Sequence, residues 1–281
     1  MTRIQCRSVF ISDVHLGLPD CKADYLLDFL QRLDCEHLYL VGDIVDLEAL
    51  QRRPWWHASH SAVLARVLAM AAQGTRITYI PGNHDAPLRT LAGQSVANIE
   101  VKLAAEHVAA DGRRYRVSHG DAYDPERIGR TWQRFGDFMQ NLVCLLNRHF
   151  NRLRRMLRLP YLPLSLVLKS RTPRAMAYIR AFENRVARDT RAAGFDGAIC
   201  GHIHYGHLRR IEGVLYLNDG DWVEHCTALT EDALGRFQLL HWSERPVTLG
   251  HVTAAGGVQA SPERVPALRP LAAMRWLSAL H

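Results

Sequence analysis

Five short segments of the chain carry Asp, Asn and His residues at spacings that suit metal binding. Hard divalent cations prefer carboxylate and carbonyl oxygens, whereas imidazole nitrogen binds manganese, iron and zinc alike. Two such ions about 3.5–4 Å apart can hold the attacking and the departing oxygen of a phosphoryl transfer. The sequence therefore predicts a two-metal site for hydrolysis at phosphorus. Its predicted ligands are Asp13, His15, Asp43, Asn83, His119, His202 and His204.

Each of these segments directly follows an apolar run that predicts a buried strand. The runs alternate with stretches of helical periodicity at 24–33 and 60–73, which indicates an α/β fold. In such folds functional sites gather beyond the carboxyl ends of the strands. A spacing of two, as in Asp13 and His15, places both side chains on one face of an extended loop. The predicted strands cover 8–12, 37–41, 76–80, 114–118 and 197–200, with a sixth at 214–217.

The strand pattern stops between residues 123 and 190. Helices are predicted there instead, at 128–150, 152–159 and 175–191. We therefore expect a helical cap insertion over 123–190, a core formed by 1–122 and 191–247, and a C-terminal tail over 248–281. Arginines alternate with leucines around residues 152–168, a pattern typical of a helix at a membrane surface. A helix with leucines packed on the domain and solvated arginines would produce the same pattern.

Composition narrows the class of partner and the cellular setting. A net charge of +7 and a pI near 9.3 indicate a nucleic acid, an anionic lipid or a phosphate-bearing substrate, unless the arginine content reflects genome composition alone. No run of eighteen apolar residues predicts a membrane span. The six cysteines contain no CxxC pair, so we expect neither a zinc ribbon nor a disulfide framework. With no signal peptide at Met1 to Phe10, we expect a cytoplasmic protein.

The five segments, in this order over residues 13–204, resemble the five sequence blocks of the calcineurin-like metallophosphoesterases. The resemblance implies a four-layer α/β/β/α sandwich with a helical cap insertion. It also implies that His84 assists catalysis and that Asp85 orients the ring of His84. One metal would be held by Asp13, His15, Asp43 and His204. The other would be held by Asp43, Asn83, His119 and His202, with Asp43 bridging.

The position of the predicted cap, between the fourth and fifth blocks, resembles one branch of this family, the UDP-2,3-diacylglucosamine diphosphatases of lipid A synthesis. This resemblance implies two Mn²⁺ ions, release of UMP and a lipid phosphate, and peripheral association with the anionic inner membrane. Lys169, Arg171 and Arg174 would then lie nearest the substrate phosphates.

One departure from that branch keeps other functions open. The best-known diphosphatases have arginine after the asparagine of the third block, where this chain has His84. The alternatives are a general or cyclic-nucleotide phosphodiesterase and a non-catalytic scaffold. No nucleic-acid partner is expected, because arginines interleaved with leucines suit a lipid surface better than a phosphate backbone.

Overall fold

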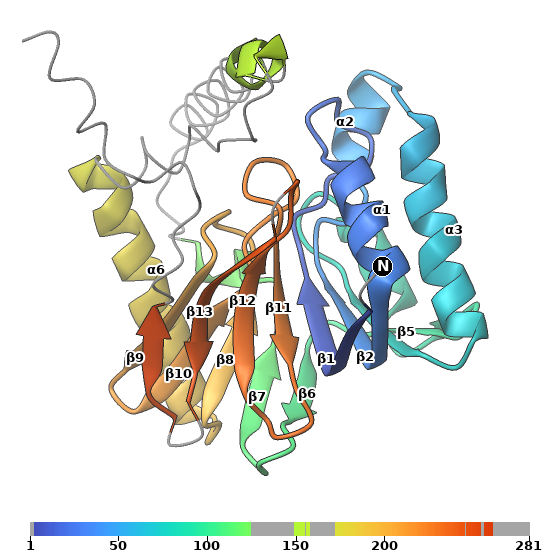
Figure 1. The fold of residues 1–281 in the computed structure, drawn as a ribbon. Helices are drawn as coiled ribbons and strands as arrows, with labels where there is room; N and C mark the ends of the chain where they lie inside the picture. The colour runs from blue at the N-terminus through green and yellow to red at the C-terminus, as the bar shows by residue number, and fades with distance from the viewer. Residues whose placement is uncertain are drawn as a thin grey trace, which may run out of the picture.

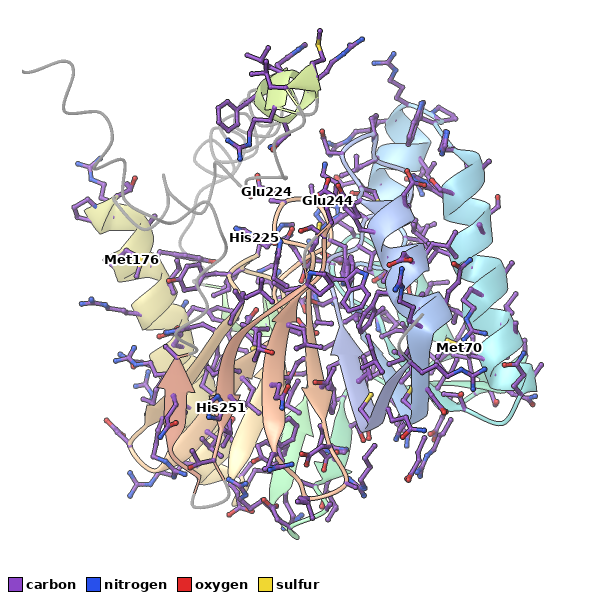
Figure 2. The ribbon with its side chains drawn as sticks, viewed as in Figure 1. Met70, Met176, Glu224, His225, Glu244 and His251 are labelled. Carbon is purple, nitrogen blue, oxygen red and sulfur yellow. The ribbon has the colours of Figure 1, made fainter. Side chains whose placement is uncertain are left out.

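The computed structural model describes residues 3–124, 149–154, 156–157, 172–244, 246–253 and 256–260. Two β-sheets stack face to face, and helices cover the outer face of each sheet (Figure 1). This arrangement confirms the predicted α/β sandwich. Met70 on α3 and Met176 on α6 mark the two opposite helical layers (Figure 2).

The first sheet has nine strands, in the order β14-β13-β12-β11-β1-β2-β3-β5-β4. Strands β1, β2, β3 and β5 run parallel, so their carboxyl ends meet at one edge of the sheet, whereas β11 joins β1 antiparallel. The bounds are β1 Ile4–Ile11, β2 Leu33–Val41, β3 Arg76–Ile80, β4 Ser95–Val96, β5 Ile99–Val101, β11 Thr227–Glu231, β12 Phe237–His241, β13 Val247–Val252 and β14 Val258–Ala260.

The second sheet has five strands, in the order β6-β7-β8-β10-β9. Strands β7, β8 and β10 are parallel, and the two edge strands are antiparallel to their neighbours. The bounds are β6 Ala105–Val108, β7 Arg114–Val117, β8 Gly197–Cys200, β9 His207–Ile211 and β10 Val214–Asn218.

Helices pack on the sheets through apolar faces. Leu26, Phe29 and Leu30 of α1 are fully buried against the first sheet, and Phe182 and Val186 of α6 are buried against the second. A third apolar cluster fills the space between the sheets. The helices are α1 Ala23–Arg32, α2 Leu47–Arg52, α3 Ala58–Ala72 and α6 Pro173–Ala192, with short 3₁₀ turns η1 Ala86–Leu91 and η2 Asp121–Tyr123.

Two predicted boundaries differ from the structure. Helix α6 was expected within the cap, but it packs on β8 and β10 and so forms the outer layer of the core. Residues 247–260 were expected mostly in the tail, but β13 and β14 extend the first sheet. In both places the element continues the core, because α6 packs on the strand that follows it in the chain and β13 pairs with the strand that precedes it.

Most of the predicted cap lies outside the described residues. Residues 149–154 are helical as predicted, and the rest of the helix predicted at 128–150 is not described. Among the described residues, no helix combines the length and the apolar character that crossing a membrane requires.

Candidate metal centre

The loops that follow β1, β2, β3, β7 and β8 bring all five predicted segments to one end of the sandwich. The first three loops come from the first sheet and the last two from the second. The predicted placement beyond the carboxyl ends of parallel strands therefore agrees with the structure.

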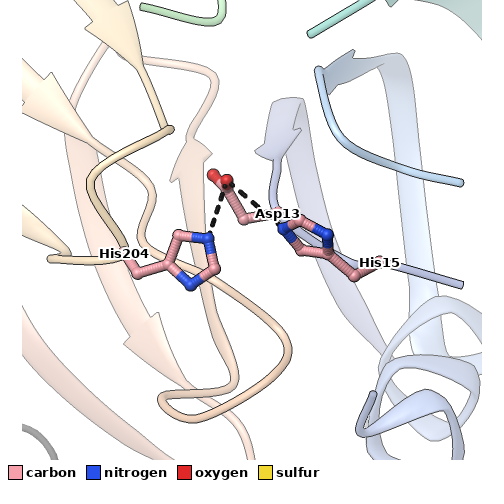
Figure 3. A group of neighbouring side chains, drawn as sticks. All are labelled: Asp13, His15 and His204. Atoms are coloured by element: carbon pink, nitrogen blue, oxygen red, sulfur yellow. Dashed lines mark ion pairs between the residues drawn. The ribbon is translucent and has the colours of Figure 1, made fainter. Parts of the chain in front are cut away.

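Asp13, His15 and His204 form the first cluster of potential ligands, and Figure 3 shows Asp13 between the two imidazole rings. Its Oδ1 lies 3.1 Å from His204 Nε2 and 3.9 Å from His15 Nε2. Asp13 Oδ1 and His15 Nε2 are buried, yet neither makes a hydrogen bond within the part of the chain that is described. Buried polar atoms without partners are rare, and a bound cation would satisfy both.

Asp43, His119 and His202 form the second cluster. His119 Nε2 lies 3.2 Å from Asp43 Oδ2 and 3.2 Å from Asn83 Oδ1. Asp43 Oδ2 is also 3.9 Å from His15 Nε2, so this carboxylate faces both clusters, as a bridging ligand must. Burial disfavours a charged His119, but the neighbouring Asp43 outweighs burial and raises the pKa of His119 to about 10.

Hydrogen bonds behind the clusters fix which ring nitrogen faces inward. His15 Nδ1 donates to Asp46 Oδ2 at 2.9 Å, and His119 Nδ1 donates to the Val41 carbonyl at 2.9 Å. Both rings therefore present Nε2 to the site. His202 is turned the other way, because its Nε2 donates to Asp124 Oδ2 at 2.9 Å and leaves Nδ1 as the free acceptor.

The backbone of the ligand loops is strained. Non-glycine residues rarely adopt positive φ, and such residues cluster at functional sites. Five of the predicted ligands do so: Asp13 (49°), His15 (52°), Asp43 (53°), His202 (69°) and His204 (47°).

The glycines of the ligand segments allow this close packing. A Cβ at Gly82 would lie 2.3 Å from Asp43 Oδ1, and a Cβ at Gly201 would lie 2.4 Å from Asp13 Oδ2. Any larger residue at either position would displace a ligand carboxylate.

The structure corrects the predicted role of Asp85. Its buried carboxylate accepts bonds from Ile44 N, Gly82 N and Tyr79 Oη, so it braces the loops and does not orient His84. The ring of His84 instead meets Asp46, with Nδ1 3.2 Å from Oδ2, and remains about one-third exposed. Burial opposes protonation of His84, but the bond to Asp46 outweighs it and raises the pKa to about 9.

Sequence reasoning also missed the support behind Asp13. Ser12 Oγ lies 2.6 Å from Asp13 Oδ2 and 2.6 Å from Asp219 Oδ1. Asp219 is fully buried, and burial raises its pKa well above the usual range. Asp46 had a visible signal, since it lies three residues after Asp43 in the same loop. Asp124 and Asp219 had no such signal, because the residues they support, His202 and Ser12, are far from them in the sequence.

The predicted phosphate-binding cations are only partly placed. Arg174 lies exposed in the first turn of α6. Lys169 and Arg171 lie outside the described residues, so the role of all three stays a prediction.

The donor set fits two divalent ions. Carboxylate and amide oxygens are combined with imidazole nitrogens, a mixture that suits Mn²⁺, Fe²⁺ and Zn²⁺ and does not select among them. The first ion could be held by Asp13, His15 and His204 together with Asp43. The second could be held by Asp43, Asn83, His119 and His202.

Comparison with known proteins identifies the family. The family model of the calcineurin-like phosphoesterases matches residues 6–206, which include every predicted ligand. The chain therefore belongs to the calcineurin-like phosphoesterase family, and it is a metal-dependent phosphoester hydrolase. No curated protein sequence matches the chain.

Solved structures are similar to this chain at low identity. Vacuolar protein sorting 29 from Cryptosporidium parvum is 11% identical, with 90% of this chain and 97% of that chain covered and a TM-score of 0.43. The E. coli phosphoesterase Yfce is 15% identical, with 85% and 97% covered and a TM-score of 0.43. A dimetal phosphatase from Danio rerio is 14% identical, with 86% and 97% covered and a TM-score of 0.40. The family assignment rests on the family model and not on these likenesses.

Proposed function

We propose that the protein hydrolyses the pyrophosphate of a lipid-linked nucleotide sugar of the UDP-2,3-diacylglucosamine type, using two Mn²⁺ ions. Water adds to one phosphorus, the bridging P–O bond breaks, and UMP and a lipid phosphate leave. The observation that carries the hydrolytic part is the pair of ligand clusters joined by Asp43, with His84 beside them.

Three parts of this reaction come from the bound ions and from the chain's own residues. Two divalent ions bound at the clusters would stabilise negative charge on the phosphoryl oxygens. Asp43 fixes the spacing of the clusters, because it contacts His119 and faces His15. Asp46 holds His84 Nδ1, which leaves Nε2 to donate to a phosphoryl oxygen or to the departing phosphate.

Exposed apolar side chains in the described part of the cap support the lipid-linked substrate. Leu153, Met156 and Leu157 are 55%, 76% and 62% exposed, and Arg152 and Arg154 lie beside them in sequence. Apolar and cationic side chains together suit an acyl chain and an anionic membrane surface. The proposal includes a peripheral position of the protein on the cytoplasmic side of such a membrane.

The test is release of UMP from UDP-2,3-diacylglucosamine by Mn²⁺-loaded protein, with Asp43→Ala as the inactive control. UMP should appear in equal amount with the lipid phosphate. Absence of UMP release under these conditions would overturn the proposal.

His84 favours a second function, a general phosphodiesterase, since it stands where the diphosphatases have an arginine that contacts phosphate. That function predicts hydrolysis of bis(p-nitrophenyl) phosphate or cyclic nucleotides at rates independent of acyl chains. Loss of all hydrolysis, despite bound metal, would instead indicate a scaffold.

A further inference from the structure

A cavity of about 300 Å³ adjoins the metal centre and has no role in the reaction described so far. His119, a predicted ligand of the second metal, forms part of its wall. A molecule bound in the cavity would therefore lie beside His119, at the edge of the second ligand cluster.

Two arginines from different elements line this cavity. Arg89 comes from η1, and its Nη2 donates to Asp121 Oδ2 at 2.7 Å. Arg116 comes from β7, where its neighbours Tyr115 and Val117 are buried between the sheets. Because side chains alternate along a strand, Arg116 points to the opposite face, where the cavity lies.

Arg116 differs from the arginines around it. Arg116 is half-buried as a residue, and within the described ranges no hydrogen bond or ion pair joins it to another side chain. Arg114 on the same strand is bound to Glu106, and Arg113 is bound to Asp111. A partly buried cation without a carboxylate partner is unfavourable unless an anion binds it.

The rest of the wall restricts the kind of anion. Leu103 and Ala104 give the cavity an apolar part, and Asp121, the carboxylate partner of Arg89, also lines it. Guanidinium groups bind phosphate through two parallel hydrogen bonds, and the apolar side suits the organic group that the phosphate carries. A substrate with a single phosphate would place that phosphate at the metals and leave Arg116 unpaired.

We propose that this cavity is a subsite for the second, unreacted phosphate of a diphosphate substrate, with Arg116 as its principal contact and Arg89 as an additional cation. The subsite rests on the proposed function and specifies it, because it selects diphosphates over simple phosphodiesters. Arg116 here is a binding residue that determines specificity.

The first experiment compares two substrates in the full-length, Mn²⁺-loaded protein. The selectivity is the ratio of kcat/KM for UDP-2,3-diacylglucosamine to kcat/KM for bis(p-nitrophenyl) phosphate. Arg116→Gln should lower this ratio on the order of tenfold or more, because it removes a charge-assisted contact made by the diphosphate alone. Arg116→Lys should give an intermediate ratio, and it tests the subsite should the glutamine variant fold poorly. Arg114→Gln is the matched control on the same strand and should leave the ratio unchanged.

A second experiment separates failure of the subsite from failure of the lipid substrate. UDP and UMP are compared as inhibitors of bis(p-nitrophenyl) phosphate hydrolysis at saturating Mn²⁺. Tighter inhibition by UDP in the wild type, lost in Arg116→Gln, supports the subsite even where the lipid is not hydrolysed. Equal inhibition by UDP and UMP in the wild type overturns it, as does an unchanged selectivity ratio in Arg116→Gln.

Discussion

At the scale of single residues, Asp46 connects metal binding to catalysis. One of its oxygens accepts from His15 and faces His84, and the other caps α2 through Ala49 N at 2.7 Å. Burial would raise the pKa of Asp46, but the bonds from the two histidines hold it well below its usual range. The carboxylate is therefore charged at neutral pH and sets the orientation of both rings.

Asp46→Asn should weaken metal binding by roughly 10–100-fold, because the amide cannot serve both histidines as an anionic acceptor. Titration of the metal-free protein with Mn²⁺ measures this loss, and turnover at saturating Mn²⁺ measures the separate effect on His84. Glu48→Gln, on exposed α2, is the control for metal binding only, because Glu48 Oε2 lies 3.8 Å from His84 Nδ1. This variant should bind metal as the wild type does. Wild-type metal affinity in Asp46→Asn would contradict the role given to Asp46.

His84→Ala and Asp43→Ala should fail in different ways. Removal of His84 should leave metal content unchanged and slow turnover by about 10²–10⁴-fold, the usual contribution of a positioned acid or base. Removal of Asp43 should eliminate both metals, because this carboxylate faces both clusters. Elemental analysis alongside kcat distinguishes the two, and wild-type turnover in both variants would refute the assignment of the site.

At the scale of elements, one buried carboxylate ties the outer helix to the second sheet. Glu183 of α6 is 1% exposed and accepts from His207 Nδ1 and Arg209 Nη1 of β9, each at 2.7 Å. Burial alone would raise the pKa of Glu183, but the bonds from these two residues lower it below the usual value. The same strand follows the loop of His202 and His204, so this contact also supports the metal centre.

Glu183→Gln should destabilise the protein by about 1–3 kcal/mol at pH 7, since it weakens two charge-assisted bonds. The pKa of Glu183 is lower in the folded state than in the unfolded chain. Its stabilisation is therefore complete above the unfolded pKa, near 4.3, and declines as pH falls through the folded value. Urea unfolding at pH 7 and pH 3 should show a difference between variant and wild type that shrinks in acid. Arg191→Gln is the control. Arg191 lies on the same helix as Glu183 and forms an exposed pair with Glu212, which follows β9, so this change should alter stability little.

At the scale of the whole molecule, the metal centre joins the two sheets. Its ligands follow β1, β2 and β3 in the first sheet and β7 and β8 in the second. Ions bound there would bind the folded chain only, because the unfolded chain does not hold the five loops together. Metal binding and global stability are therefore coupled.

Mn²⁺ at about 100 times its dissociation constant should stabilise the fold by about 2.7 kcal/mol per independent site, and a chelator should reverse the effect. Thermal unfolding at increasing Mn²⁺ concentrations measures it. Asp43→Ala should unfold at a temperature that does not depend on Mn²⁺. If Mn²⁺ raised the unfolding temperature of Asp43→Ala as much as that of the wild type, the stabilising ions would bind at another site.

The sequence predicted those parts of the molecule whose signals are local. Parallel strands such as 37–41 and 197–200 are mostly apolar in sequence, and each is followed at once by a ligand loop. Strands β11 to β14 were not predicted. In β11, for example, Thr227–Glu231 contains Thr and Glu although all five residues are buried. The hydrogen-bond partners of the ligands could not be predicted either. Asp124 and His202, for example, are 78 residues apart in the sequence and come together only in the folded chain.

The left-handed backbone of the ligand loops lowers the stability of the fold at residues that the reaction requires. A non-glycine residue held in such a conformation lowers the stability of the fold by about 1–3 kcal/mol. His202 and His204 are two of the five predicted ligands with this backbone. Glycine at either position would relieve that cost and remove a ligand. In a gene copy no longer selected for hydrolysis, replacement of these ligands by glycine would therefore raise stability and abolish activity. In this chain all five positions keep a ligand residue, so the backbone cost is present at each of them.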